Sequence, residues 1–169
     1  SEGGFKRSGS IRVLFGQQSL AALSTVEMSG PDEDGRMGYP VASAGDVNGD
    51  GYADIIAGSG SIGGGGLARA YLVYGGPVRL AATLRIGIPA ASFGWIVAST
   101  GDINGDGYSD FGVNRNIYYG GPSVDTVVDR ILQDTPDFLS PLGDFNKDGL
   151  DDLLVSPGPK AYFGGASAE

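Results

Sequence analysis

The sequence contains no cysteine and no histidine among its 169 residues, and each absence removes whole classes of chemistry. Without cysteine the chain can form no disulfide and offers no thiolate to a metal. Without histidine it has no imidazole acid or base, no Ser-His-Asp triad and no histidine ligand for zinc. Basic residues are also few, 11 against 20 acidic ones, and the net charge of −9 argues against a nucleic-acid partner.

Long apolar runs are missing as well. No run approaches the roughly 18 residues that a membrane-spanning helix needs, so we expect no membrane insertion. The first residues, Ser-Glu-Gly-Gly, do not form a signal peptide, and the chain is either a mature form or cut from something longer. Glycine, in contrast, is abundant: its 31 residues are spread along the whole chain and favour many tight turns over helices.

A short acidic pattern, D-x-N-x-D-G-x-x-D, occurs three times. It reads DVNGDGYAD at 46–54, DINGDGYSD at 102–110 and DFNKDGLDD at 144–152. One copy alone could be an ordinary turn rich in Asp and Asn. Three copies that all keep the ninth-position aspartate favour a dedicated binding loop instead.

The spacing within this pattern suits a hard divalent cation. Oxygen atoms at positions 1, 3 and 5, a carbonyl at 7 and a carboxylate at 9 can surround an ion, and the glycine at position 6 permits the sharp turn. A ligand set made only of oxygen selects calcium over zinc or copper. An EF-hand is excluded because it needs flanking helices and a glutamate at position 12, where this chain has Ala57, Val113 or Val155.

Each acidic loop is followed by an aromatic residue and glycine. The segments are YLVYGGP at 71–77, NIYYGGP at 116–122 and KAYFGGA at 160–166, and a fourth relative, IRVLFGQQ at 11–18, has no acidic loop before it. Their aromatic residues recur every 44 to 59 residues. Because IRVLF, ADIIAG, ARAYLVY and WIVAS read as strands and no stretch has a sustained helical period, we predict an all-β chain. The repeat length favours β-propeller blades of four antiparallel strands.

The three acidic copies resemble FG-GAP repeats, which occur in the propeller of integrin α subunits and in related secreted proteins and lectins. The FG pair itself is present as Phe93-Gly94 and is replaced by Met37-Gly38 and Thr135-Pro136 in the other copies. The resemblance implies a calcium loop between the first and second strands of each blade. It implies three Ca²⁺ sites with these ligands, the residue at position 7 contributing its carbonyl: Asp46, Asn48, Asp50, Tyr52 and Asp54; Asp102, Asn104, Asp106, Tyr108 and Asp110; Asp144, Asn146, Asp148, Leu150 and Asp152.

We expect a single propeller region, 1–169, divided into blades at about 1–36, 37–92, 93–134 and 135–169, of which the first and last are partial. The count is about 13 strands, or three to four blades, and closed propellers usually have four to eight complete ones. Uncovered strand edges and apolar blade faces are usually covered by another chain. We therefore expect a homodimer, or a complementary fragment of the same parent that completes the propeller.

The leading functional hypothesis is a calcium-binding recognition or adhesion module, secreted or at the cell surface, with a protein or carbohydrate ligand. We expect the glycine-rich stretch 59–67 and the link 31–36 to lie on the face opposite the calcium loops. The resemblance implies that partners bind on that face. The alternatives are a secreted lectin and the non-catalytic propeller of a larger extracellular enzyme. We expect no catalysis, since nine of the twenty acidic residues are assigned to calcium and no spare carboxylate pair stands out.

Three single residues complete the predictions. Trp95, the only tryptophan, is expected to pack at a blade boundary and not to stack on a sugar. Lys147 and Asp151, both in the third loop, are expected to face solvent.

Overall fold

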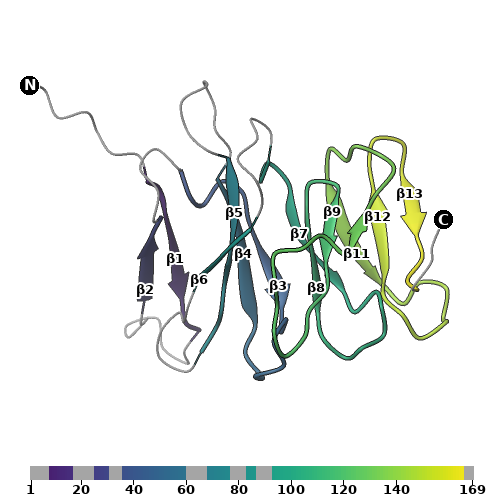
Figure 1. Ribbon diagram of the computed structural model, residues 1–169, viewed down its shortest axis with the longest axis horizontal. Helices are drawn as coiled ribbons and strands as arrows, with labels where there is room; N and C mark the ends of the chain where they lie inside the picture. Colours follow the sequence, from purple (N-terminus) through teal and green to yellow (C-terminus); the bar gives the residue numbers. More distant parts are fainter. Residues whose placement is uncertain are drawn as a thin grey trace, which may run out of the picture.

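The computed structural model describes residues 8–16, 25–30, 36–59, 68–76, 83–86 and 93–165, and every regular element in these ranges is a strand. Four antiparallel sheets stand side by side in chain order (Figure 1). The predicted fold class, a partial β-propeller made of antiparallel blades, is confirmed. None of the described residues lies in a helix long and apolar enough to cross a membrane.

We number the four sheets as blades 1 to 4. Blade 1 has the strands β1 (Ser10–Leu14) and β2 (Thr25–Ser29). Blade 2 has β3 (Val41–Gly45), β4 (Asp54–Ser59), β5 (Arg69–Val73) and β6 (Thr83–Ile86). Blade 3 has β7 (Val97–Gly101), β8 (Asp110–Val113), β9 (Asn116–Tyr118) and β10 (Arg130–Ile131). The described strands of blade 4 are β11 (Leu139–Gly143), β12 (Asp152–Val155) and β13 (Lys160–Tyr162).

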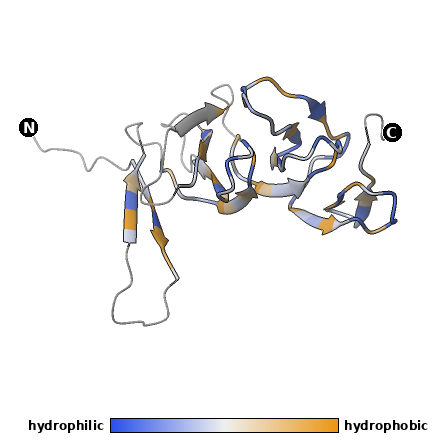
Figure 2. Ribbon diagram, turned by 90° about the horizontal axis from the view of Figure 1, so that it is seen from below, coloured by the Kyte–Doolittle hydropathy of each residue, from blue (hydrophilic) through white to orange (hydrophobic). Residues whose placement is uncertain are grey.

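Within each blade, strands that follow one another in the chain pair with one another. The segments IRVLF, ADIIAG, ARAYLVY and WIVAS fall on β1, β4, β5 and β7, so the strand predictions for them are confirmed. Along β1 and β2, the strands nearest the N-terminus, hydrophobic and hydrophilic residues alternate (Figure 2). That period of two is expected for strands with one covered face.

The apolar core lies between neighbouring blades and not inside any one of them. Between blades 2 and 3, Val47, Ile56 and Leu72 pack against Val97 and Phe111. A second cluster joins blades 3 and 4 through Ile103, Ile117, Leu139, Leu153 and Val155. The blades therefore depend on each other for burial, as expected for a repeat array.

The first strand of blades 2, 3 and 4 ends in a β-bulge just before its acidic loop. The pairing register shifts between Ser43 and Gly45 in blade 2, and at the equivalent places in blades 3 and 4. The glycine at the bulge has a φ of 79°, 75° or 66°, a left-handed conformation that residues with a Cβ rarely adopt. The glycine that precedes each acidic pattern in the sequence is therefore required by this turn.

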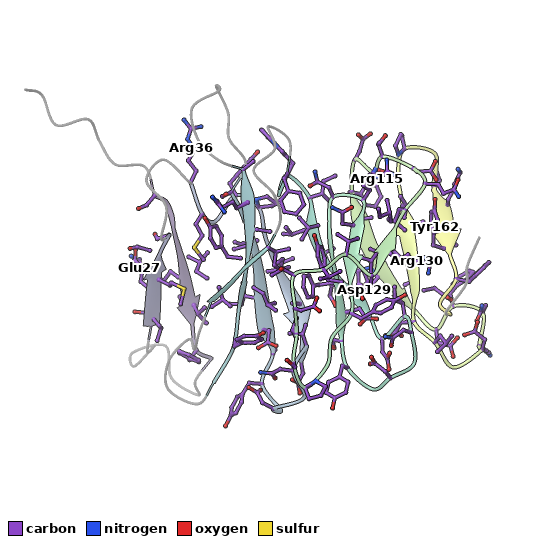
Figure 3. The ribbon with its side chains drawn as sticks, in the orientation of Figure 1. Glu27, Arg36, Arg115, Asp129, Arg130 and Tyr162 are labelled. Carbon is purple, nitrogen blue, oxygen red and sulfur yellow. The ribbon has the colours of Figure 1, made fainter. Side chains whose placement is uncertain are left out.

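Two expected features of the opposite face fall mostly outside the described residues. These are the glycine-rich stretch 59–67, described only at Ser59, and the link 31–36, described only at Arg36. The described part of that face includes Arg36 and Arg115 (Figure 3).

Candidate functional site

The three acidic loops join the first and second strands of blades 2, 3 and 4. The β3–β4, β7–β8 and β11–β12 connections lie along the same edge of the array, the lower one in Figure 1. Each loop begins at a bulge and ends at a strand whose first residue is the ninth-position aspartate.

The side chains at positions 1, 3 and 5 bend back onto their own loop. In the first loop, Asp46 Oδ1 accepts the N–H groups of Gly49 and Asp50 at 2.8 and 3.0 Å, and its Oδ2 accepts Gly51 N–H at 2.8 Å. Asn48 Oδ1 accepts Asp50 N–H at 3.0 Å, and Asp50 Oδ1 accepts Tyr52 N–H at 2.9 Å. These bonds hold three side-chain carbonyl or carboxylate groups around one short turn.

The other two loops repeat this arrangement. In the second loop, Asp102 accepts N–H groups from Gly105, Asp106 and Gly107. In the third, Asp144 accepts N–H groups from Asp148 and Gly149. The sequence repeat is therefore also a repeat of loop geometry.

The ninth-position aspartates, Asp54, Asp110 and Asp152, are fully buried. The carboxylate of each one connects two parts of its blade through hydrogen bonds. One oxygen accepts the N–H of the second loop residue, as Asp110 Oδ2 does from Ile103 at 3.0 Å. The other accepts an N–H from the turn after the third strand, as Asp110 Oδ1 does from Gly120 at 2.8 Å.

This turn is the aromatic–glycine element of the sequence, and its glycine is a functional partner that sequence reasoning missed. Gly75 and Gly164 occupy the same place as Gly120 and donate to Asp54 and Asp152 at 2.8 and 3.0 Å. Beside each of the three glycines lies a backbone carbonyl that a Cβ would overlap. The sequence does hold a signal for this partner, because the aromatic–glycine element follows every acidic loop.

The loops concentrate negative charge, and within the described ranges no basic side chain forms an ion pair with them. Burial raises the pKa of Asp54, two backbone hydrogen bonds lower it, and the charges of Asp50 and Asp46 raise it further. Burial, together with the charges of Asp106 and Asp102, raises the pKa of Asp110 to about 7, although two backbone hydrogen bonds lower it. The ion pairs found among the described residues, Arg12–Glu27 and Lys160–Asp134, involve no residue of the acidic loops.

A calcium ion fits the composition of these loops better than it fits their present geometry. Among the described residues, no group of three carboxylates is gathered closely enough to hold a metal ion. The structure brings positions 1, 3 and 5 together, whereas the ninth aspartate faces backbone N–H groups. Each oxygen that accepts one N–H retains a second lone pair, so a small rotation would let it also bind a cation. The donor set is all oxygen and its charge is uncompensated, which suits calcium.

The structure also decides the three single-residue predictions. Trp95 lies at a blade boundary as expected, its ring 6.2 Å from that of Tyr39 in an edge-to-face arrangement. Lys147 is exposed, as predicted. The prediction for Asp151 is wrong: its Oδ2 accepts Asp102 N–H at 2.9 Å, because blade 4 packs against the second loop.

Comparison with known proteins agrees with the repeat pattern. Residues 46–113 match the model of the FG-GAP-like repeat. An alignment 108 residues long, which covers 59% of the chain, is 35% identical to integrin alpha pat-2 of Caenorhabditis briggsae and 32% identical to that of Caenorhabditis elegans. The match covers 8% of the length of either relative. The resemblance to FG-GAP repeats and to integrin α subunits is thereby confirmed.

Proposed function

Since this chain carries FG-GAP-like repeats, we propose that it is part of an extracellular, integrin-like propeller that binds calcium and recognises a partner without catalysing a reaction. The observation that carries the proposal is the repeated loop geometry. Three loops with the same oxygen groups lie along one edge of the β-array, and in each the first aspartate accepts the N–H groups of positions 5 and 6. A purely structural Asx turn would not require a buried, uncompensated carboxylate at the end of each loop.

The ligands proposed for calcium are the side chains at positions 1, 3, 5 and 9 and the carbonyl oxygens of Tyr52, Tyr108 and Leu150. Bound calcium would supply the positive charge that these carboxylates lack. Because Asp54, Asp110 and Asp152 each also hold the turn after the third strand, the ion would strengthen a connection that spans its blade. Calcium would therefore stiffen the scaffold and not take part in chemistry.

The proposed partner site is the opposite face, which includes the edge-to-face pair Tyr39 and Trp95 and the guanidinium groups of Arg36 and Arg115. Tyr39 and Trp95 remain 60% and 37% exposed. Exposed aromatic and arginine side chains are the residues most enriched at protein interfaces. A protein ligand is the first choice, because the relatives are integrin α subunits.

A carbohydrate ligand is the second candidate function, since exposed Tyr and Trp rings also suit a sugar. In that case the chain would act as a secreted lectin. A third arrangement is a non-catalytic propeller within a larger extracellular enzyme. Glycan-array binding that Trp95→Ala and Tyr39→Ala remove would favour the lectin, whereas capture of a protein partner with the same dependence would favour the adhesion module.

Calorimetric titration of the metal-free chain with calcium tests the central proposal. We expect about three sites, and Asp50→Asn, Asp106→Asn and Asp148→Asn should each weaken one of them. The asparagine keeps one oxygen that can accept the backbone N–H of position 7. It removes the charge and the second oxygen, which accepts the side-chain N–H of the asparagine at position 3. Asp137→Asn, at an exposed position outside the loops, is the matched control. Absence of any calcium-dependent heat at millimolar calcium would contradict the proposal.

A further inference from the structure

We propose that Asp151, which lies in the third acidic loop, is a positioning residue for the calcium site of the second loop and makes that site the tighter of the first two. The inference rests on the proposed function, because it concerns the sites proposed there for calcium. Its basis is a comparison within the molecule. Blade 3 meets the first loop as blade 4 meets the second, and the eighth residue of the incoming loop is neutral in one case and charged in the other.

The two contacts share their backbone hydrogen bonds. Ser109 N–H of blade 3 donates to Asp46 O of the first loop at 3.1 Å, and Asp151 N–H of blade 4 donates to Asp102 O of the second loop at 3.1 Å. A bond to the carbonyl of loop position 2 accompanies each of them, at 2.8 and 2.7 Å. The next blade therefore holds the first two residues of each of these loops.

The side chains of Ser109 and Asp151 occupy equivalent places, over the bulge glycine of the preceding blade. A Cβ on Gly45 would overlap Ser109 Oγ, and a Cβ on Gly101 would overlap Asp151 Oδ2. The bulge glycine thus leaves room for the eighth residue of the next loop. Because this glycine is present in both places, an aspartate at position 109 has the room that Asp151 uses.

The two residues differ in what their side chains hold. Asp151 Oδ2 accepts Asp102 N–H at 2.9 Å, a bond that Ser109 does not make to Asp46 N–H in the described part of the chain. Both backbone polar groups of Asp102 are therefore fixed by one residue. The carboxylate of Asp102 organises its loop by accepting the N–H groups of positions 4, 5 and 6. A ligand whose backbone is already fixed loses less freedom when its side chain binds an ion.

The strand that follows keeps Asp151 in this position. β12 begins at the fully buried Asp152, whose Oδ1 accepts Gly164 N–H at 3.0 Å. The carbonyl of Asp151 lies beside the same glycine, where a Cβ on Gly164 would come within 2.6 Å of it. The side chain of Asp151 therefore extends toward the second loop from a well-held backbone.

Asp151 also brings a fourth negative charge to the second loop. The ligands proposed for that loop include three carboxylates, those of Asp102, Asp106 and Asp110, and the first loop likewise has three. The ion pairs found among the described residues do not include Asp151, so no basic side chain offsets its charge there. Since calcium affinity depends on the charge and the rigidity of a site, both effects favour the second site over the first.

Calorimetric titration with calcium tests the proposal in chains that keep one of the two sites. Asp50→Asn with Asp148→Asn retains the second site, and Asp106→Asn with Asp148→Asn retains the first. We expect calcium to bind the second-site chain more tightly than the first-site chain. Asp151→Ser, added to the second-site chain, should weaken binding by about tenfold, within the range usual for residues that orient metal ligands.

Asp151→Asn separates the charge from the hydrogen bond. It keeps an oxygen that can accept Asp102 N–H and removes the charge, so in the second-site chain it should weaken binding by only about threefold. Higher salt should reduce this difference. The matched control is Asp137→Asn, which removes a charge at an exposed position outside the loops and should leave calcium binding unchanged. Circular dichroism in EDTA checks that every variant is folded.

The decisive variant is Ser109→Asp in the first-site chain. It introduces an aspartate at the place equivalent to Asp151 and should tighten calcium binding there by about tenfold, a gain that a residue of purely structural importance would not give. If Asp151→Ser leaves the second site unchanged and Ser109→Asp leaves the first unchanged, the inference is overturned while calcium binding itself stands. Absence of any calcium-dependent heat in the parent chain would overturn both proposals.

Discussion

The carboxylate of Asp151 accepts the backbone N–H of Asp102 at 2.9 Å across the boundary between blades 3 and 4. The neighbouring N–H of Asp151 in turn donates to Asp102 O at 3.1 Å. One residue of the third loop thus holds both polar backbone groups of the first residue of the second loop. Neighbouring acidic loops are therefore mechanically linked.

Replacing Asp151 with alanine should destabilise the chain. The change removes the carboxylate that accepts Asp102 N–H in a partly buried hydrogen bond, so this N–H loses its acceptor. The loss should lower the free energy of unfolding by about 1–2 kcal/mol. Asp151→Asn keeps an acceptor oxygen and should cost less. Urea unfolding monitored by circular dichroism measures both, with Asp137→Ala as the exposed control; equal stability of all three variants would contradict this link.

Gly120→Ala should destabilise blade 3 strongly. A Cβ at Gly120 would overlap Ser109 O and lie 2.8 Å from both Val47 O and the Tyr108 Cβ, so backbone and side chains would have to move. Overpacking of this kind typically costs about 1–3 kcal/mol, and here it also disturbs the hydrogen bond to Asp110. Gly16→Ala, where a Cβ meets nothing within 4 Å, is the matched control. A thermal melt in which the two variants are equally stable would refute the role of Gly120.

The stability of the chain should depend on pH because of the raised pKa of Asp110. Its pKa is raised to about 7 in the folded chain, mainly by burial, from an ordinary value of 3.8. Between these two pKa values the folded state holds a proton that the unfolded state has released. The stability that this proton provides is fully present below about pH 4 and is lost as the pH rises through about 7. In EDTA, the melting temperature of the Asp110→Asn variant should fall less over this range than that of the parent chain. Parallel curves for the two proteins would argue against a raised pKa.

The architecture followed from local patterns in the sequence. Short segments of β-branched and aromatic residues bounded by glycine and proline located β1, β4, β5 and β7, and the period of the aromatic–glycine element indicated the blades. The strand β10 has only two residues, and its place is set by pairing with β9 and not by any pattern of its own. Such a strand cannot be located from its own residues.

The site was predictable in its residue types but not in its contacts. The spacing of Asp46, Asn48 and Asp50 implied that they share one turn, and they do. The bond between Asp54 and Gly75 joins residues 21 positions apart and depends on the pairing of β4 with β5. The error at Asp151 has a similar cause, because nothing in its own loop reveals that the preceding blade lies against it.

Calcium should raise the stability of the chain. The proposed ligands include nine of its carboxylates, and three bound Ca²⁺ ions would change the net charge from −9 to about −3. A ligand that binds only the folded state stabilises it by RT ln(1 + [L]/Kd). With millimolar calcium and a Kd of about 10–100 μM, each site would add roughly 1–3 kcal/mol.

Variants of the individual loops should show how much each site contributes to the stabilisation by calcium. Asp50→Asn, Asp106→Asn and Asp148→Asn should each remove about a third of the calcium-induced rise in melting temperature, whereas Asp137→Asn should keep all of it. In EDTA each loop variant loses one charge from a group of repelling carboxylates. It also loses the bond that its second oxygen accepts from the asparagine at position 3, so its stability should stay close to that of the parent chain. Melting curves that coincide in EDTA and in calcium for the parent chain would show that the loops act as turns alone, held by the N–H groups that now bind their oxygens.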